Sequence, residues 1–130
     1  MSHMKVLLVD DEEELVSTMA ERLSLRGIDA DWSTSSEDAL RRLETCRYDI
    51  AVLDVKIPRI NGIELKKQME QKCSHTKFIF LTGHGSERDF RVGSLEAGPE
   101  FYLVKPVNIE DLIEKMDQLM EKGKEDVHGK

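Results

Sequence analysis

Short apolar runs alternate with longer amphipathic stretches along this chain. Five runs are typical of strands, at residues 5–9, 28–33, 50–53, 77–81 and 101–104. Between and after these runs, apolar side chains recur every three or four positions, which predicts helices through 15–23, 39–43, 65–69, 86–97 and 109–120. The pattern therefore divides the chain into five strand–helix units and leaves no second set of elements that could form another core.

Glycine, proline and serine mark the boundaries between these elements. We expect Gly27 to end the first helix, either Ser35 or Ser36 to cap the second, and Gly98-Pro99 to close the fourth. Alternating strands and helices imply a parallel sheet with helices on both faces, and the polar second strand suits a sheet edge. We therefore predict a single doubly wound α/β domain, a flavodoxin-like (βα)5 fold with strand order 2-1-3-4-5.

Composition narrows the class of protein. The net charge is -7 at pH 7, which argues against nucleic-acid binding by this domain itself. No apolar run approaches the ~20 residues of a membrane span, and no signal-peptide pattern is present, so we expect a cytoplasmic protein. Residues 1–3 are typical of a cloning remnant, 4–121 form the predicted domain, and 122–130 are expected to be a polar tail or the start of a linker.

The two cysteines, Cys46 and Cys73, lack the spacing of a metal site. In the cytoplasm we expect them to be reduced, partly buried thiols.

Three aspartates follow two of the predicted strands. Asp10 and Asp11 come directly after residues 5–9, and Asp54 follows residues 50–53. In the predicted order these strands are neighbours, and ligands of such sheets bind outside the carboxyl ends of the strands. At about 4 Å and an effective dielectric constant near 20, each pair of like charges costs roughly 4 kcal/mol. Because carboxylate oxygens are hard ligands, the trio predicts a site for Mg²⁺.

Two further polar side chains come at strand ends, Thr82 after residues 77–81 and Lys105 after residues 101–104. A phosphoryl group fits the combined set, because the cation and Lys105 would neutralise its oxygens while Asp54 attacks in line. Each residue also has a plainer interpretation: an Asp pair can cap a helix, Asp54 or Thr82 can form a turn, and Lys105 can be solvated. Their joint position at strand ends favours the phosphoryl site.

Four segments carry a resemblance to a known family. In chain order they are Val-Leu-Leu-Val-Asp10-Asp11-Glu12, Leu53-Asp54-Val-Lys-Ile-Pro58 followed by Gly62, Leu81-Thr82-Gly83, and Tyr102-Leu-Val-Lys105-Pro106. Each segment is common alone, but the ordered set at this spacing is specific, although Gly98-Pro99-Glu100 departs from the commonest pattern. On these segments the chain resembles the receiver domain of two-component response regulators.

The resemblance implies a role for each residue at the strand ends. Asp54 would be the phosphoacceptor, and Asp10, Asp11 and the backbone carbonyl of Lys56 would join it in holding Mg²⁺. Thr82 and Lys105 would bind the phosphoryl group.

Other residues would act around this site. Thr82 and Tyr102 would be the switch residues, and the Lys105–Pro106 bond would be cis. Lys56 and His84 would flank the phosphoryl group, and they either tune the lifetime of the phosphorylated state or are surface residues without a role.

The implied function is a phosphorylation-dependent signalling switch, not a metabolic enzyme, that catalyses its own phosphoryl transfer and dephosphorylation. A sensor histidine kinase or phosphotransfer protein would supply the phosphoryl group. The face of the fourth helix, fifth strand and fifth helix would then control an output domain or downstream protein, and could also form a homodimer. Two alternatives remain open: an aspartyl-phosphate phosphatase, which normally needs a second Asp where Lys56 lies, and a phosphate-independent scaffold.

Overall fold

The structure is a computed structural model that describes residues 4–83 and 102–128. Strands and helices alternate within these ranges. In chain order they are β1 (Lys5–Val9), α1 (Glu13–Leu25), β2 (Asp29–Ser33), α2 (Ser36–Leu43), β3 (Ile50–Asp54), α3 (Gly62–Lys72), β4 (Lys77–Thr82), β5 (Tyr102–Val104) and α5 (Ile109–His128). The helix predicted at 86–97 lies outside the described residues. Among the helices that are described, none has both the length and the apolar character needed to span a bilayer.

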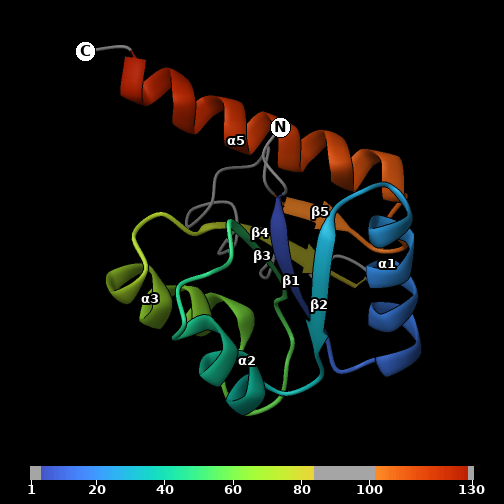
Figure 1. The fold of residues 1–130 in the computed structure, drawn as a ribbon. Coiled ribbons are helices and arrows are strands. Elements are labelled where there is room, and N and C mark those ends of the chain that lie inside the picture. The colour runs from blue at the N-terminus through green and yellow to red at the C-terminus, as the bar shows by residue number, and fades with distance from the viewer. Residues whose placement is uncertain (1–3, 84–101, 129–130) are drawn as a thin grey trace.

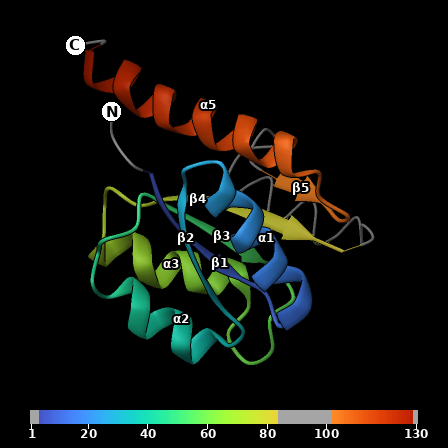
Figure 2. The ribbon, with the colours of Figure 1, turned by 45° about the vertical axis from the view of Figure 1, so that its right-hand side comes forward.

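The described strands form one parallel sheet in the order β2-β1-β3-β4-β5, which confirms the predicted topology (Figure 1). Successive side chains of β1 point to opposite faces of this sheet. Val6 and Leu8 pack with apolar residues of α1 and α5, whereas Leu7 and Val9 pack with those of α2 and α3. Figure 2 shows the same division, with α1 and α5 on one side of the sheet and α2 and α3 on the other. Both faces are therefore covered, and polar side chains gather at the strand ends.

Local signals set most element boundaries as the sequence predicts. Gly27 follows α1 with a φ of 83°, in the left-handed region that glycine favours. Of the two candidate serines, Ser35 caps α2, because its hydroxyl accepts the N–H of Asp38 at 3.1 Å. The helix α5 continues to His128, so residues 122–128, which we expected to be a polar tail or the start of a linker, have a helical backbone.

The prediction of two reduced thiols was wrong, because Cys46 and Cys73 are joined by a disulfide with a Cα–Cα distance of 5.3 Å. Cys46 lies just beyond α2, and Cys73 is the C-cap of α3. These two helices pack side by side on one face of the sheet (Figure 1). The sequence separation of 27 residues does not show this proximity, since it arises only when the helices pack.

Candidate functional site

The carboxyl ends of β1 and β3 bring the three predicted aspartates together. Val9 pairs with Leu53 in the register of the two strands, which places Asp10 beside Asp54. One oxygen from each of Asp10, Asp11 and Asp54 lies within 4.8 Å of the others. Asp10 and Asp54 are buried and Asp11 is exposed, so the trio extends from the interior of the protein to solvent.

Asp10 and Asp54 use their two oxygens in the same way. The Oδ1 atom of Asp10 accepts the N–H of Glu12 at 2.9 Å, and that of Asp54 accepts the N–H of Lys56 at 3.0 Å. Each aspartate therefore forms a local turn, which the plainer interpretation expected for Asp54 but not for Asp10. Neither Asp10 nor Asp11 is the N-cap of α1, since that position is Glu12 and has no side-chain cap. The Oδ2 atoms of Asp10 and Asp54 remain directed into the site.

Lys105, directly after β5, forms ion pairs with both of these Oδ2 atoms. Its Nζ lies 2.5 Å from Asp10 Oδ2 and 3.0 Å from Asp54 Oδ2, and the side chain is only 15% exposed. The backbone N–H of Lys105 donates to the carbonyl of Thr82 at 2.7 Å, and the following bond to Pro106 is cis, as predicted. The plainer interpretation of a solvated lysine is therefore wrong.

Glu12 is a contact that sequence reasoning did not predict. Its Oε1 lies 3.1 Å from Lys105 Nζ, although the side chain is 64% exposed. The only signal in the sequence is its position directly after the two aspartates. Below, the group formed by Asp10, Asp11, Glu12, Asp54 and Lys105 is called the acidic site.

Charge is unbalanced in the acidic site, where four carboxylates face one ammonium group. Burial raises the pKa of Asp10, the nearby Asp54 raises it further, and the bonds from Lys105 and the Glu12 N–H oppose this only in part. Burial lowers the pKa of Lys105, but its pairing with Asp10, Asp54 and Glu12 outweighs burial and the pKa is raised. Lys105 therefore stays charged, yet it does not neutralise the site.

The donor set of the acidic site fits a divalent cation. Three carboxylates supply hard oxygen atoms within one small volume, which is the chemistry that Mg²⁺ and Ca²⁺ require. A second positive charge would also relieve the repulsion by Asp54, which adds to the effect of burial in raising the pKa of Asp10. The backbone carbonyl of Lys56 stays a predicted ligand, since only its N–H bond to Asp54 is established.

The loop after Asp54 is fixed by a close backbone contact. A Cβ atom on Gly62 would lie 2.5 Å from the carbonyl oxygen of Asp54, so a larger residue cannot occupy this position without a shift. The N–H of Gly62 donates to the carbonyl of Val55 at 3.2 Å. The first turn of α3 is therefore held against the end of β3, which carries Asp54.

The two predicted switch residues lie on neighbouring strands. Thr82 ends β4, next to β3, and its hydroxyl donates to the carbonyl of Gly83 at 2.9 Å, which is the local turn contact of the plainer interpretation. Tyr102 is buried, and its ring packs edge-on against Phe80 with centroids 6.3 Å apart. Their switching role stays a prediction, and His84 lies outside the described residues.

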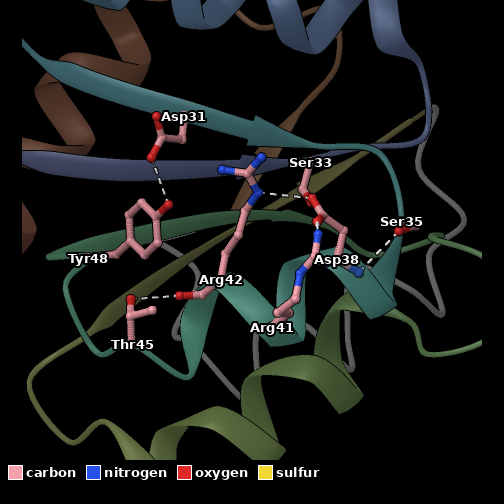
Figure 3. A network of polar contacts seen from close by, with 8 residues as sticks. All are labelled: Asp31, Ser33, Ser35, Asp38, Arg41, Arg42, Thr45 and Tyr48. Carbon is pink, nitrogen blue, oxygen red and sulfur yellow. Dashed lines mark hydrogen bonds and ion pairs between the residues drawn. The ribbon is translucent and has the colours of Figure 1, made fainter.

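A second polar cluster, which the sequence did not reveal, lies along β2 and α2 (Figure 3). Asp38 accepts bonds from Ser33, Arg41 and Arg42, and its backbone N–H is capped by Ser35. The bond from Ser33, together with both guanidinium groups, lowers the pKa of Asp38 to about 2. We call Ser33, Asp38, Arg41 and Arg42 the Asp38 network.

Comparison with protein-family models matches residues 6–117 to the response regulator receiver domain. The chain is 38% identical over 102 residues to the alkaline phosphatase synthesis transcriptional regulatory protein PhoP of Bacillus subtilis, covering 78% of this chain and 42% of that protein. It is 38% identical over 119 residues to the transcriptional regulatory protein CpxR of Escherichia coli, covering 92% of this chain and 50% of that protein. The chain thus spans about half the length of these curated relatives.

Solved structures agree with this match. A CheY-like receiver domain protein from Methanospirillum hungatei is similar with a TM-score of 0.85 and 28% identity, covering 96% of this chain and 99% of that chain. A Burkholderia pseudomallei response regulator, solved with a phosphorylated aspartic acid and a calcium ion, has a TM-score of 0.75 and covers 94% of this chain and 74% of that chain. At 22% identity the latter shows the fold alone. From the match over residues 6–117 and the shared fold, the chain belongs to the response regulator receiver domain family of two-component systems.

Proposed function

We propose that this domain, residues 4–121, is a signalling switch that accepts a phosphoryl group on Asp54 from a histidine kinase or a phosphotransfer protein. The observation that carries the proposal is the meeting of Asp10, Asp11 and Asp54 around a charged, half-buried Lys105. A paired carboxylate with its counter-charge already in place can attack an anionic phosphoryl group with less repulsion. Mg²⁺ in the same pocket would neutralise further charge on the transferred group.

The contacts of Asp54 suggest a different role for each of its two carboxylate oxygens. Oδ1 is held by the N–H of Lys56, which fixes the carboxylate plane, while Oδ2 faces Lys105. In the transfer step an Asp54 oxygen forms a bond to phosphorus, the phosphorus–nitrogen bond of the donor imidazole breaks, and the released nitrogen takes a proton from water. Lys105 then pairs with an oxygen of the attached phosphoryl group. The same domain would catalyse the later attack of water on this group.

The switch needs new contacts that are absent before phosphorylation. Moving a two-state equilibrium from mostly off to mostly on needs about 5.5 kcal/mol. Charge-assisted hydrogen bonds supply roughly 1.5–3 kcal/mol each, so Thr82 and Lys105 together could supply most of it. We propose that the Thr82 hydroxyl leaves the Gly83 carbonyl for the phosphoryl group and that Tyr102 adjusts behind it. The face of the fourth helix, β5 and α5 would carry the change.

We further propose that this change controls an output domain or a partner protein. The curated relatives are transcriptional regulators about twice as long as this chain, which supports an output in transcription. With a net charge of -7, the domain itself is not expected to grip nucleic acid. A cytoplasmic location and a homodimer through the switching face stay predictions from the sequence.

Incubation with Mg²⁺ and acetyl phosphate, followed by intact mass, tests the proposal. Wild-type protein should gain one phosphoryl group that is lost on treatment with hydroxylamine, and Asp54→Asn should gain none. Asp38→Asn is the matched control, since it removes an ion-paired aspartate outside the acidic site and should be labelled like wild type. Turnover of acetyl phosphate without accumulation would indicate a phosphatase, and no reaction in any variant would indicate a scaffold.

The lifetime of the phosphorylated state tests the residues beside Asp54. Lys56→Ala and His84→Ala should change the half-life of the label if these side chains control the approach of water. Unchanged half-lives in both variants would identify them as surface residues without a role.

A further inference from the structure

The disulfide lies at the opposite end of the sheet from the acidic site. Cys46 precedes the first residue of β3 and Cys73 precedes the first residue of β4, whereas the acidic site lies where strands end. Cys73 is buried, 3% exposed, and its N–H donates to the carbonyl of Met69 at 2.8 Å. Cys46 is half-buried. Cys73 is therefore held in the core, and Cys46 is the more accessible of the two residues.

Cys46 has a backbone conformation that glycine usually adopts, which indicates that its side chain has a specific role. Its φ is 56°, in the left-handed region, and its N–H donates to the carbonyl of Leu43 at 3.0 Å. Such a residue just beyond a helix is usually glycine, or sometimes asparagine, because a Cβ is disfavoured there. A thiol at this position is placed where it meets Cys73, with a Cα–Cα distance of 5.3 Å inside the range of about 4.4–6.8 Å that disulfides span.

We propose that Cys46 and Cys73 form a reversible redox modification site that takes small disulfides of the glutathione class. The Cys46 thiolate attacks one sulfur of the small disulfide and expels a small thiolate, which forms a mixed disulfide. The Cys73 thiol loses its proton and attacks the Cys46 sulfur, expelling the second small thiolate. Two protein thiols thus lose two electrons and two protons, and the small disulfide becomes two small thiols.

The half-buried position of Cys46 gives the order of these steps. Exchange requires access to the attacking thiolate, and Cys46 has the greater access. Cys73 is packed in the apolar cluster with Leu43 and Met69, so it reacts only with the sulfur placed beside it. Excess small thiol reverses the sequence by entering at Cys46, the more accessible of the two residues.

The bond would act on the segment that carries Asp54. It closes a ring that contains β3, Asp54 and all of α3. At one end of α3, Gly62 contacts the backbone of Asp54, and at the other end Cys73 is the C-cap. Oxidation therefore fastens the last turn of α3 to the end of α2, and reduction releases it.

A glutathione titration tests this site without any phosphorylation. Reduced protein is equilibrated with mixtures of reduced and oxidised glutathione and quenched in acid. The remaining free thiols are labelled with a maleimide, and the labels are counted from the intact mass of the protein. Both thiols should lose their label together in one transition of the monomer, and both should be recovered in excess reduced glutathione. Loss of only one label, an intermolecular dimer, or a bond that persists in excess reduced glutathione would each overturn the proposal.

Single-cysteine variants test the order of attack. Cys73→Ser should form a stable mixed disulfide at Cys46. Cys46→Ser should react at Cys73 with a rate about tenfold lower than this, or lower still. Equal rates would overturn the assignment of Cys46 as the entering thiol. Asp54→Asn should give the wild-type titration, so a failure of phosphoryl acceptance leaves this result unaffected.

Amide exchange measures the consequence for α3. Oxidation should slow the exchange of the amides of residues 69–73 by a larger factor than that of residues 6–9 in β1, whose exchange changes only with the stability of the whole domain. From the length of the closed loop, the ratio of unfolded to folded protein at a fixed urea concentration should fall about 400-fold on oxidation. An equal factor in both segments would show that the bond does not fasten α3.

Discussion

The acidic site and the Asp38 network both place partly buried carboxylates beside cationic side chains, but their charge balance is opposite. In the Asp38 network one carboxylate receives bonds from two guanidinium groups and a hydroxyl, and the pKa of Asp38 falls to about 2 (Figure 3). In the acidic site four carboxylates share the single ammonium of Lys105, and burial keeps the pKa of Asp10 above its usual value. The first arrangement is satisfied by the protein alone, whereas the second still needs positive charge.

This difference separates structural polar clusters from sites that bind a ligand. A satisfied cluster has no free energy to gain from an added ion, while an unbalanced one does. The comparison predicts that equivalent Asp→Asn substitutions in the two clusters have opposite effects on stability.

The largest expected effect is this opposite response, measured by urea unfolding in the presence of a chelator. Asp38→Asn loses charge-assisted bonds from Arg41 and Arg42 and should lower the free energy of unfolding by about 1–3 kcal/mol. Asp10→Asn keeps its Oδ1 bond to the Glu12 N–H and removes repulsion with Asp54, so it should raise that free energy by about 1 kcal/mol. Changes of the same sign in both variants would refute the comparison.

The affinity for Mg²⁺ should depend on the acidic site and not on the Asp38 network. Asp11 is exposed and supplies one of the three clustered carboxylates. Asp11→Asn should weaken Mg²⁺ binding about tenfold or more, because affinity follows the number of charged ligands. Asp38→Asn should leave the affinity unchanged in the same calorimetric titration. An Asp11→Asn variant that binds Mg²⁺ like wild type would place the ion elsewhere.

Acid titration gives a smaller effect with a defined sign. Because the folded-state pKa of Asp38 is lowered from 3.8 to about 2, its contribution is fully present above about pH 4 and is lost as the pH falls toward 2. The side chain is 25% exposed, so after allowance for solvent screening we expect about 1 kcal/mol. The unfolding free energy of wild type should fall more steeply than that of Asp38→Asn across this window. Parallel curves would mean that Asp38 is not stabilised by its partners.

The sequence predicts the acidic site apart from Glu12, because the positions of its other members depend on strand ends. Asp10, Asp54 and Lys105 each follow an apolar run, and topology rules alone bring those run ends to one edge of a parallel sheet. No side-chain conformation has to be known for that argument. The same is true of the fold class, which follows from the alternation of elements.

Features that depend on how helices pack or side chains turn were not predictable. The Cys46–Cys73 bond requires the ends of α2 and α3 to meet, and the Asp38 network requires Ser33 of β2 to face α2. The i,i+3 and i,i+4 spacing of Asp38 with Arg41 and Arg42 is visible in the sequence, but it is common on solvated helix faces. The Asp38 network, which is the better satisfied of the two clusters, was therefore not predicted from the sequence.

Glu12 is an exposed member of the acidic site and gives the smallest expected effect. Its contact with Lys105 is exposed, so Glu12→Gln should change the free energy of unfolding by about 0.5 kcal/mol or less. It also removes one negative charge at the mouth of the site, so phosphorylation by the anionic acetyl phosphate should become about twofold faster at low salt. The Debye length shrinks from about 30 Å at 0.01 M to about 3 Å at 1 M salt, so the gain should disappear at the higher concentration. A gain that persists at high salt would mean instead that Glu12 restrains Lys105 directly, since a contact of 3.1 Å is screened far less than a long-range field.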